Sequence, residues 1–313
     1  MRPILDLPRA KIAVELTSRC NLRCAMCPMS DLQRPQQDMP WELVEKVAAD
    51  FRNNGATVNW LHEMGDPLLY PRLGEAIDLF PGCSVSTNAL ALTPKVGHEL
   101  VDSSLGRIRL CVDTLLPGLY HQIRRGSRFD QVVTNIRQFL ELARGSRMRI
   151  EVQRLITSET HHETVRDFAR FFDLDRYPNA GVIEKTCEPL DTVDETEWHQ
   201  AYYGCFQGYP FRWFIVLADG TVTHCCYDAQ GQQLIGDLKT QTVQEIVHSE
   251  RLADLAEAFR TRDWTRLPRC GECFRRPAAK PLIYDAMVLI GTHMERVIPL
   301  GPIKRWGRRL FNR

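Results

Sequence analysis

Short runs of apolar and β-branched residues alternate with longer amphipathic stretches through the first 185 residues. Runs of this kind are typical of buried strands, and the longer stretches are typical of helices. The predicted strands are Ile12–Leu16, Val58–Leu61, Ser84–Thr87, Ile108–Val112, Arg149–Ile156 and Gly181–Glu184. Repeated strand–helix units predict a parallel sheet with right-handed crossovers. We therefore predict an α/β fold, a partial (β/α)6 barrel of the TIM type, over residues 1–185.

The helices between these strands have recognisable ends. Thr93 has the character of an N-cap, Pro94 suits the first turn that follows it, and Gly145 suits a C-cap. The predicted helices run from Pro40 to just before Gly55, from Pro94 to just before Gly106, from Asp130 to Arg144 and from Thr160 to Phe172.

The pattern changes after residue 185. Residues 186–204 combine a proline with acidic and polar residues, and we interpret them as a linker. Residues 205–275 predict a small α+β domain: a hairpin of Trp213–Leu217 and Thr221–Cys225 that turns at Asp219-Gly220, then one helix from about Val243 to Phe259. Residues 276–313 form a basic C-terminal tail.

Composition narrows the classes of function. The chain of 313 residues is 44% hydrophobic and 25% charged, and its net charge is +1. This balance fits a soluble globular protein, and it offers no overall field that would attract nucleic acid. The N-terminus lacks the apolar core of a signal peptide, so we expect a cytoplasmic protein. In a reducing compartment its 11 cysteines are not expected to form disulfides.

Three cysteines follow the first predicted strand within eight residues: Cys20, Cys24 and Cys27. Four thiolates saturate a four-iron cubane, so three leave one iron open for another ligand. An open position is what a catalytic metal site requires. The alternative is a zinc knuckle or three unrelated thiols, although the residues after Cys27 offer zinc only a poor fourth ligand.

The spacing CxxxCxxC, with the apolar Met26 before its last cysteine, resembles the radical S-adenosylmethionine (SAM) superfamily. The resemblance extends in order over residues 12–185. It implies a [4Fe-4S] cluster with three cysteine ligands, whose open iron chelates SAM. Reductive cleavage of SAM then yields a 5′-deoxyadenosyl radical that removes a hydrogen atom from the substrate. It also implies a flavodoxin- or ferredoxin-type electron donor.

Other residues at the ends of predicted strands match the same family. The segment 62–67 resembles its glycine–glutamate–proline turn, although Asp66 stands where glutamate is commoner. By this resemblance the cofactor-binding residues are Met26, Glu63, Gly65, Asp66, Ser86, Asn88, Asp113 and Arg154. Taken singly, these residues also fit turns, loop caps and strand surfaces.

A second set of cysteines lies beyond the linker: Cys205, Cys225, Cys270 and Cys273. Four thiolates can saturate a cubane, and they can equally hold a structural zinc ion. The pattern resembles the twitch domain, the shortened form of the SPASM domain, and this implies one auxiliary [4Fe-4S] cluster. Cys226 adjoins Cys225 and is an alternative ligand.

Enzymes with this pair of domains resemble aminocyclitol alcohol dehydrogenases of antibiotic biosynthesis. The leading hypothesis is thus an oxidoreductase that converts a hydroxyl of a sugar or aminocyclitol to a carbonyl. A redox-neutral epimerase is the alternative, and it requires a thiol hydrogen donor such as Cys187 or Cys226. A peptide-modifying maturase ranks third. Such enzymes commonly carry an N-terminal peptide-recognition module, and only nineteen residues precede Cys20 here. The contrasting class is a non-enzymatic electron carrier or zinc scaffold.

The C-terminal residues 296–313 contain six basic and no acidic residues. On a helix starting near Pro302, apolar residues share one face. Such a segment either packs on the barrel or makes a weak contact with a membrane surface.

Overall fold

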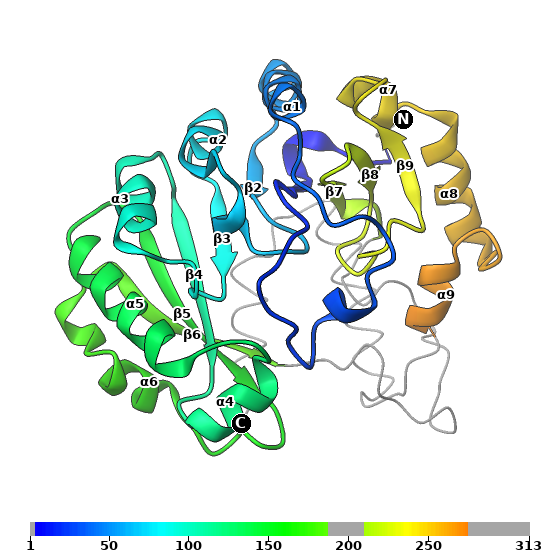
Figure 1. Cartoon of the computed structure of the whole chain (residues 1–313). Coiled ribbons are helices and arrows are strands. Elements are labelled where there is room, and N and C mark those ends of the chain that lie inside the picture. The colour runs from blue at the N-terminus through cyan, green and yellow to red at the C-terminus, as the bar shows by residue number, and fades with distance from the viewer. Residues whose placement is uncertain (1–3, 187–209, 275–313) are drawn as a thin grey trace.

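The computed structural model describes residues 4–186 and 210–274. One nine-stranded sheet runs through this part of the chain, in the order β6-β5-β4-β3-β2-β1-β7-β8-β9 (Figure 1). The strands of the predicted barrel are β1 (Lys11–Val14), β2 (Val58–Trp60), β3 (Ser84–Thr87), β4 (Arg107–Asp113), β5 (Arg149–Ile156) and β6 (Ala180–Thr186). Each is parallel to its neighbour, so the predicted fold class is confirmed.

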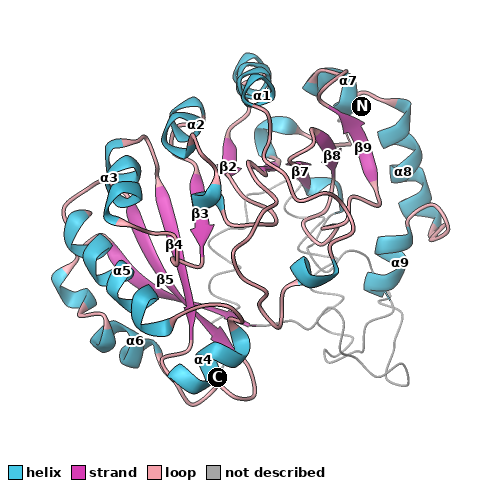
Figure 2. Cartoon of the chain, viewed as in Figure 1, coloured by secondary structure: helices cyan, strands magenta, loops and turns pink. Residues whose placement is uncertain are grey.

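Helices follow these strands and cover the outer face of the sheet (Figure 2). They are α1 (Trp41–Asn53), α2 (Leu73–Leu79), α3 (Pro94–Asp102), α4 (Pro117–Ile123), α5 (Phe129–Leu142) and α6 (Val165–Phe171). The apolar stripe of α5, Val132, Ile136 and Phe139, is buried with alternate side chains of β4 such as Leu110. Each fully buried side chain of this size contributes about 1.5–3 kcal/mol. The other face of the sheet carries both polar side chains and a second, smaller apolar cluster of Ala13, Ile215 and Leu217.

The last of the four predicted helices, α6, begins at Val165, five residues after its predicted start at Thr160. Thr164 caps α6: its hydroxyl accepts from the backbone N–H of Asp167, and the Asp167 carboxylate accepts from the backbone N–H of Thr164. Upstream, Thr157 and Thr160 hydrogen-bond to each other and to local backbone groups. These side-chain bonds hold residues 157–164 in turns, where the sequence had predicted a first helical turn.

The predicted hairpin extends the same sheet. Its strands are β7 (Trp213–Val216) and β8 (Thr221–Thr223), joined at Gly220, whose φ is +88°. β7 pairs in parallel with all four residues of β1, and β8 is antiparallel to β7. A further strand, β9 (Leu234–Asp237), pairs with β8 and was not predicted. The segment expected to carry the second set of cysteines therefore continues the barrel sheet.

The single helix predicted over residues 243–259 is wrong. The structure has α7 (Val243–Val247) and α8 (Glu250–Thr261), followed by α9 (Pro268–Phe274). The break occurs at Ser249, whose hydroxyl accepts from the N–H of Leu252 and starts a new helix as its N-cap.

Thr186, the first residue of the predicted linker, belongs to β6; the rest of the linker and the basic tail lie outside the described residues, and the domain boundaries remain predictions. Within residues 4–186 and 210–274, no helix is both long and apolar enough to cross a membrane.

Candidate functional site

Cys20, Cys24 and Cys27 lie on the loop that leaves β1 at the C-terminal edge of the sheet. Burial raises the pKa of Cys20 to about 11, and it raises the pKa of Cys24 and Cys27 as well. Negative charge on Cys24 and Cys27 adds to the rise at Cys20, because the three thiols are neighbours. Metal binding removes such protons, since the thiolate is the ligand.

N–H groups point at these sulfurs. The backbone N–H of Leu22 donates to Cys20 Sγ over 3.4 Å, and Arg124 Nη1 donates to Cys24 Sγ over 3.6 Å. In the described residues, no three His, Cys, Asp or Glu side chains converge on a point that would hold a single ion. The ligands of a cubane bind different iron atoms, so they need not converge. Three thiols on one loop, with N–H donors to sulfur, fit an iron–sulfur cluster.

Gly65 lets the turn after β2 lie directly on the cysteine loop. Its φ is +78°, and a Cβ placed there would lie 2.4 Å from the carbonyl oxygen of Thr17 and 2.8 Å from that of Arg19. The N–H of Asp66 donates to the same Arg19 carbonyl over 2.9 Å. The two loops therefore form one unit at the edge of the sheet.

Asp66 is buried, and its carboxylate is occupied within the chain. It accepts from the N–H of Leu68, the hydroxyl of Thr87 and the N–H of Asn88, at 2.9–3.0 Å. Burial raises the pKa of Asp66, and these hydrogen bonds oppose the rise. The carboxylate thus ties the turn after β2 to the end of β3. The contact with the cofactor that the resemblance implied for Asp66 remains a prediction.

Of the two site residues predicted at the end of β3, Asn88 lies beside the cysteine loop, whereas Ser86 contacts a different thiol, that of Cys111. Asn88 Nδ2 donates to Asn21 Oδ1 over 2.8 Å and lies 3.9 Å from Cys20 Sγ. Ser86 Oγ lies 3.2 Å from Cys111 Sγ on the next strand. Met26 is 37% exposed, which leaves its side chain available to a ligand.

Asp113 has a left-handed backbone, with φ of +71°, and its side chain is fully buried. Its Oδ2 accepts from Arg124 Nε over 2.6 Å, and its Oδ1 accepts from Gln153 Nε2 over 3.2 Å. Strained conformations of this kind are concentrated at functional sites. Asp113 therefore holds Arg124 against Cys24. Sequence reasoning missed Arg124, because no local motif marks it.

Arg154 is also buried, but it points elsewhere. Its Nη1 donates to Glu184 Oε1 over 2.8 Å and its Nη2 to the carbonyl of Thr160 over 3.4 Å. No contact of the described residues joins it to the thiols, although its backbone lies beside that of Asp113. Its predicted role in binding remains untested.

A buried ion pair that the sequence reasoning missed connects three segments. Glu15, at the end of β1, accepts from Arg34 Nη1 and Nη2 over 2.6 and 2.5 Å. The same carboxylate accepts from the N–H of Met64 over 2.9 Å and from that of Ala218 over 3.1 Å. Arg34 Nε donates to the carbonyl of Ala229 over 2.6 Å. An acid within an otherwise apolar predicted strand was the available signal.

The inner face of the sheet carries charged side chains around Trp60. Arg107 and Arg109 lie over the ring of Trp60, 4.5 and 4.8 Å from its centroid, and both pair with Glu151. His62 stacks edge-on against Trp60, and its buried Nδ1 has no hydrogen-bond partner among the described residues. Burial, reinforced by the neighbouring cations, lowers the pKa of His62 to about 3.

Glu63 is the next residue along the turn. Burial raises its pKa well above the ordinary value, and the nearby charge of Glu15 adds to the rise. Lys185 and Arg34 oppose this rise. The predicted contact of Glu63 with the cofactor remains a prediction.

The second set of cysteines is partly described. The N–H of Tyr227 donates to Cys225 Sγ over 3.4 Å, and Gln233 Nε2 donates to Cys270 Sγ over 3.5 Å. These sulfurs receive N–H groups as those of the first loop do, so they suit the same kind of group. Cys205 and Cys187 lie outside the described residues, as does the side chain of Cys273. Cys226 packs against the inner-face cluster of Ala13, Ile215 and Leu217.

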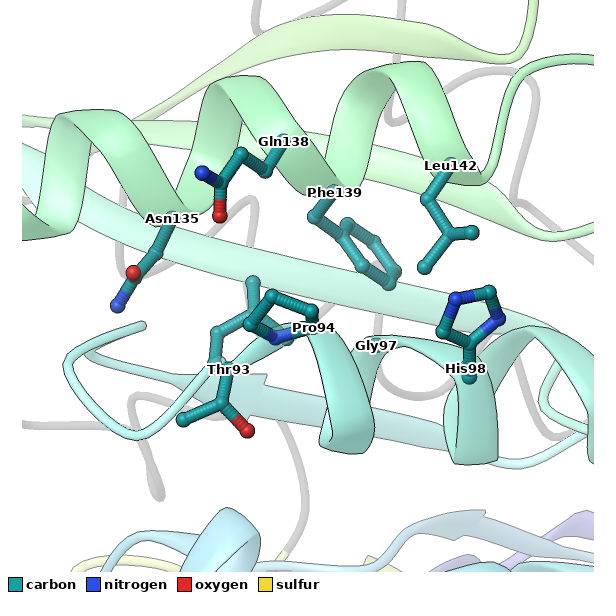
Figure 3. Close-up of a pocket in the computed structure, with 9 residues that line it drawn as sticks. Thr93, Pro94, Gly97, His98, Asn135, Gln138, Phe139 and Leu142 are labelled. Atoms are coloured by element: carbon teal, nitrogen blue, oxygen red, sulfur yellow. The ribbon is translucent and has the colours of Figure 1, made fainter.

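A cavity of about 240 Å³ lies between α3 and α5, on the outer helical layer (Figure 3). Thr93, His98, Asn135 and Phe139 are among its lining residues, and none of the predicted site residues reaches it. It belongs to the packing of two helices and not to the cysteine sites.

Both sets of cysteines lie within regions of the chain that match known protein families. Residues 14–168 match the model of the radical SAM superfamily, and residues 205–274 match that of the SPASM iron–sulfur cluster-binding domain. These domains imply a [4Fe-4S] cluster, an auxiliary cluster and SAM, as predicted from the sequence. The individual ligand assignments remain predictions.

Individual relatives are more distant. A GTP 3′,8-cyclase of Alkaliphilus metalliredigens is 29% identical over 166 residues, half of each chain. The chain therefore spans only about half the length of this curated relative. The structure of anSMEcpe with bound AdoMet and Cp18Cys peptide has a TM-score of 0.60 at 15% identity, over 93% of this chain and 98% of that one. BtrN in complex with AdoMet and 2-DOIA has a TM-score of 0.52 at 15% identity, over 80% and 86%.

Proposed function

Because the chain belongs to the radical SAM superfamily and carries a SPASM domain, we propose that it oxidises a hydroxyl-bearing carbon of a sugar or aminocyclitol to a carbonyl. When bound, the three-cysteine cluster and SAM supply a 5′-deoxyadenosyl radical, and the auxiliary cluster supplies an electron acceptor. The overall reaction takes one hydrogen atom, one electron and one proton from the alcohol.

The observation that carries the proposal is the direct connection between the two cysteine regions. Met29 and Met64 pack with Ala229 of the auxiliary segment, and Cys20 and Cys27 lie against this cluster. The ion pair of Glu15 adds a hydrogen-bonded link on the same side. Oxidation of the alcohol requires an acceptor for the second electron. An auxiliary cluster held by a segment that packs against the first cysteine loop suits this role.

The inner face offers groups that would recognise a hydroxylated substrate. His62 is neutral and its Nδ1 has no hydrogen-bond partner among residues 4–186 and 210–274, so it can bond a hydroxyl without an ion pair. Ser86 adds a hydroxyl on the neighbouring strand. Sites built to bind several hydroxyls combine such groups with aromatic surfaces, here Trp60.

Epimerisation is the second candidate, and one observation favours it. The Cys226 side chain packs against Ala13 and Ile215, whose side chains face the inner side of the sheet. A thiol at this position is suited to return a hydrogen atom to a substrate radical. With Cys225 as the predicted cluster ligand, Cys226 is the thiol that we assign to that role.

The two reactions differ in what happens at the reacting carbon. Anaerobically reconstituted enzyme would be reduced with SAM in D₂O, and a panel of aminocyclitols and sugars would be screened for stimulated 5′-deoxyadenosine formation. The proposal expects a carbonyl product without solvent deuterium at that carbon. An unoxidised product carrying one deuterium indicates epimerisation, and stimulation only by peptides would overturn both hypotheses.

A further inference from the structure

Three arginines are exposed on two adjoining loops beside the first cysteine site. They are Arg23 on the cysteine loop, and Arg125 and Arg128 between α4 and α5. The backbone N–H of Arg23 donates to the carbonyl of Arg125 over 3.0 Å, and the N–H of Ala25 donates to that of Ile123 over 2.8 Å. The two loops therefore present a joint surface.

The charges of these arginines are uncompensated. Other arginines of the same segments have acidic partners: Arg19 pairs with Asp38, and Arg124 pairs with Asp113. Among the described residues, no carboxylate lies within ion-pair distance of Arg23, Arg125 or Arg128, and the exposed Asp130 is the acid that follows them along the chain. Since the whole chain has a net charge of only +1, this is a local concentration of positive charge.

Arg23 is also held in place. Its Nη1 donates to the carbonyls of Cys20 and Leu22 over 3.0 and 2.8 Å. Carbonyl oxygens orient the guanidinium without neutralising it. These carbonyls belong to the loop that bears the three thiols, so a macromolecule bound to this surface lies against the backbone of that loop.

We propose that Arg23, Arg125 and Arg128 form the docking surface for an acidic one-electron carrier protein of the flavodoxin class. Cleavage of SAM consumes one electron, which must enter the cluster held by this loop. Complementary charge accelerates encounter and fixes the orientation of such carriers. The inference depends on the radical chemistry of the family and not on the substrate proposed above.

The test separates docking from chemistry. The variant R125E/R128E leaves the hydrogen bonds of Arg23 to the cysteine loop intact. We expect its dissociation constant for oxidised flavodoxin, measured by titration calorimetry at low ionic strength, to rise at least about tenfold. SAM cleavage driven by reduced flavodoxin falls by a similar factor, and cleavage driven by dithionite stays unchanged. The triple variant R23E/R125E/R128E is expected to weaken binding further.

The matched control is R52E/R147E, which reverses two exposed arginines that precede strands at the opposite edge of the sheet. It carries the same change in net charge. The proposal is overturned if R125E/R128E binds flavodoxin as the wild type does, or if the control weakens binding equally. Iron content of each variant, with the dithionite rate, shows whether a loss comes from a damaged cluster, which would also contradict a pure docking role.

Discussion

The two cysteine regions are built in opposite ways. The first places three thiols within eight residues of one loop, and the ends of the neighbouring strands hold that loop through Gly65, Asn88 and Arg124. The second draws Cys225 and Cys270 from segments 45 residues apart, and Cys225 lies two residues beyond the end of β8, on the loop that leaves the hairpin. The cysteines of the first region are therefore close together in the sequence, and residues from distant segments hold their loop. The cysteines of the second region come from separate segments that the fold must bring together.

The largest effect should come from removing one thiol from each region. In C24S we expect loss of one cluster, leaving about four of about eight irons per chain, and no 5′-deoxyadenosine. In C270S we expect a similar loss of iron but continued formation of 5′-deoxyadenosine, with no oxidised product. Iron analysis and chromatography of the nucleoside after anaerobic reduction measure both.

The control for this pair is C83A, which removes a thiol from the core of the barrel. It should retain the full iron content. If C270S also stopped 5′-deoxyadenosine formation, the two regions would not be separable, and the comparison between them would fail.

The next effect concerns the link between the regions. E15Q removes the charge that Arg34 pairs with, and Arg34 then remains buried without a counter-ion. Breaking a buried pair in this way costs about 3–5 kcal/mol of unfolding free energy. Urea denaturation followed by circular dichroism should show this loss. E75Q disrupts the exposed pair with Arg72 and should leave the midpoint unchanged. Equal midpoints for both variants would show that the link is not structural.

A smaller change should affect the first region alone. Gly65 and Gly82 have nearly the same φ, +78° and +77°, but a Cβ at Gly82 meets nothing within 4 Å. G82A therefore costs only left-handed strain, about 1–2 kcal/mol. G65A adds the overlap with the Thr17 carbonyl, for a total of about 2–4 kcal/mol.

The measurement for this pair combines urea denaturation with SAM-dependent 5′-deoxyadenosine formation. G65A should impair SAM cleavage, because the turn can no longer lie on the cysteine loop. G82A should cleave SAM at the wild-type rate. Equal effects of the two substitutions would show that backbone strain, and not contact between the loops, limits the site.

The features that could be predicted from the sequence are those that depend on residues close together in the chain. The bounds of β3 and β5 agree with the predicted Ser84–Thr87 and Arg149–Ile156, because alternating β-branched residues specify a strand locally. The cysteine loop was found for the same reason. The break at Ser249 was missed because an apolar periodicity continues across two helices, and only the N-cap hydrogen bond distinguishes them.

What the sequence did not predict depends on distant partners. Arg124 reaches Cys24 across 100 residues, and Glu15 reaches Ala218 across 203. No local pattern encodes such pairs, because they depend on the order of strands in the sheet. The position of β7 beside β1, which brings Ala218 to Glu15, is a feature of this kind.

The smallest expected effect tests the inner face that lies between the two regions. The pKa of His62 in the folded protein is about 3, below its ordinary value of 6.5, so the unfolded chain binds a proton that the folded chain does not. Stability from this residue is complete above pH 6.5 and falls below it by at most about 1.4 kcal/mol per pH unit. In H62Q, urea midpoints at pH 7 and 5.5 should therefore lie closer together than in the wild type. H98Q, at an exposed position, should behave like the wild type. If the difference between the two midpoints in H62Q equals that of the wild type, His62 is protonated as readily in the folded protein as in the unfolded chain. The inner face around His62 would then not be shielded from solvent.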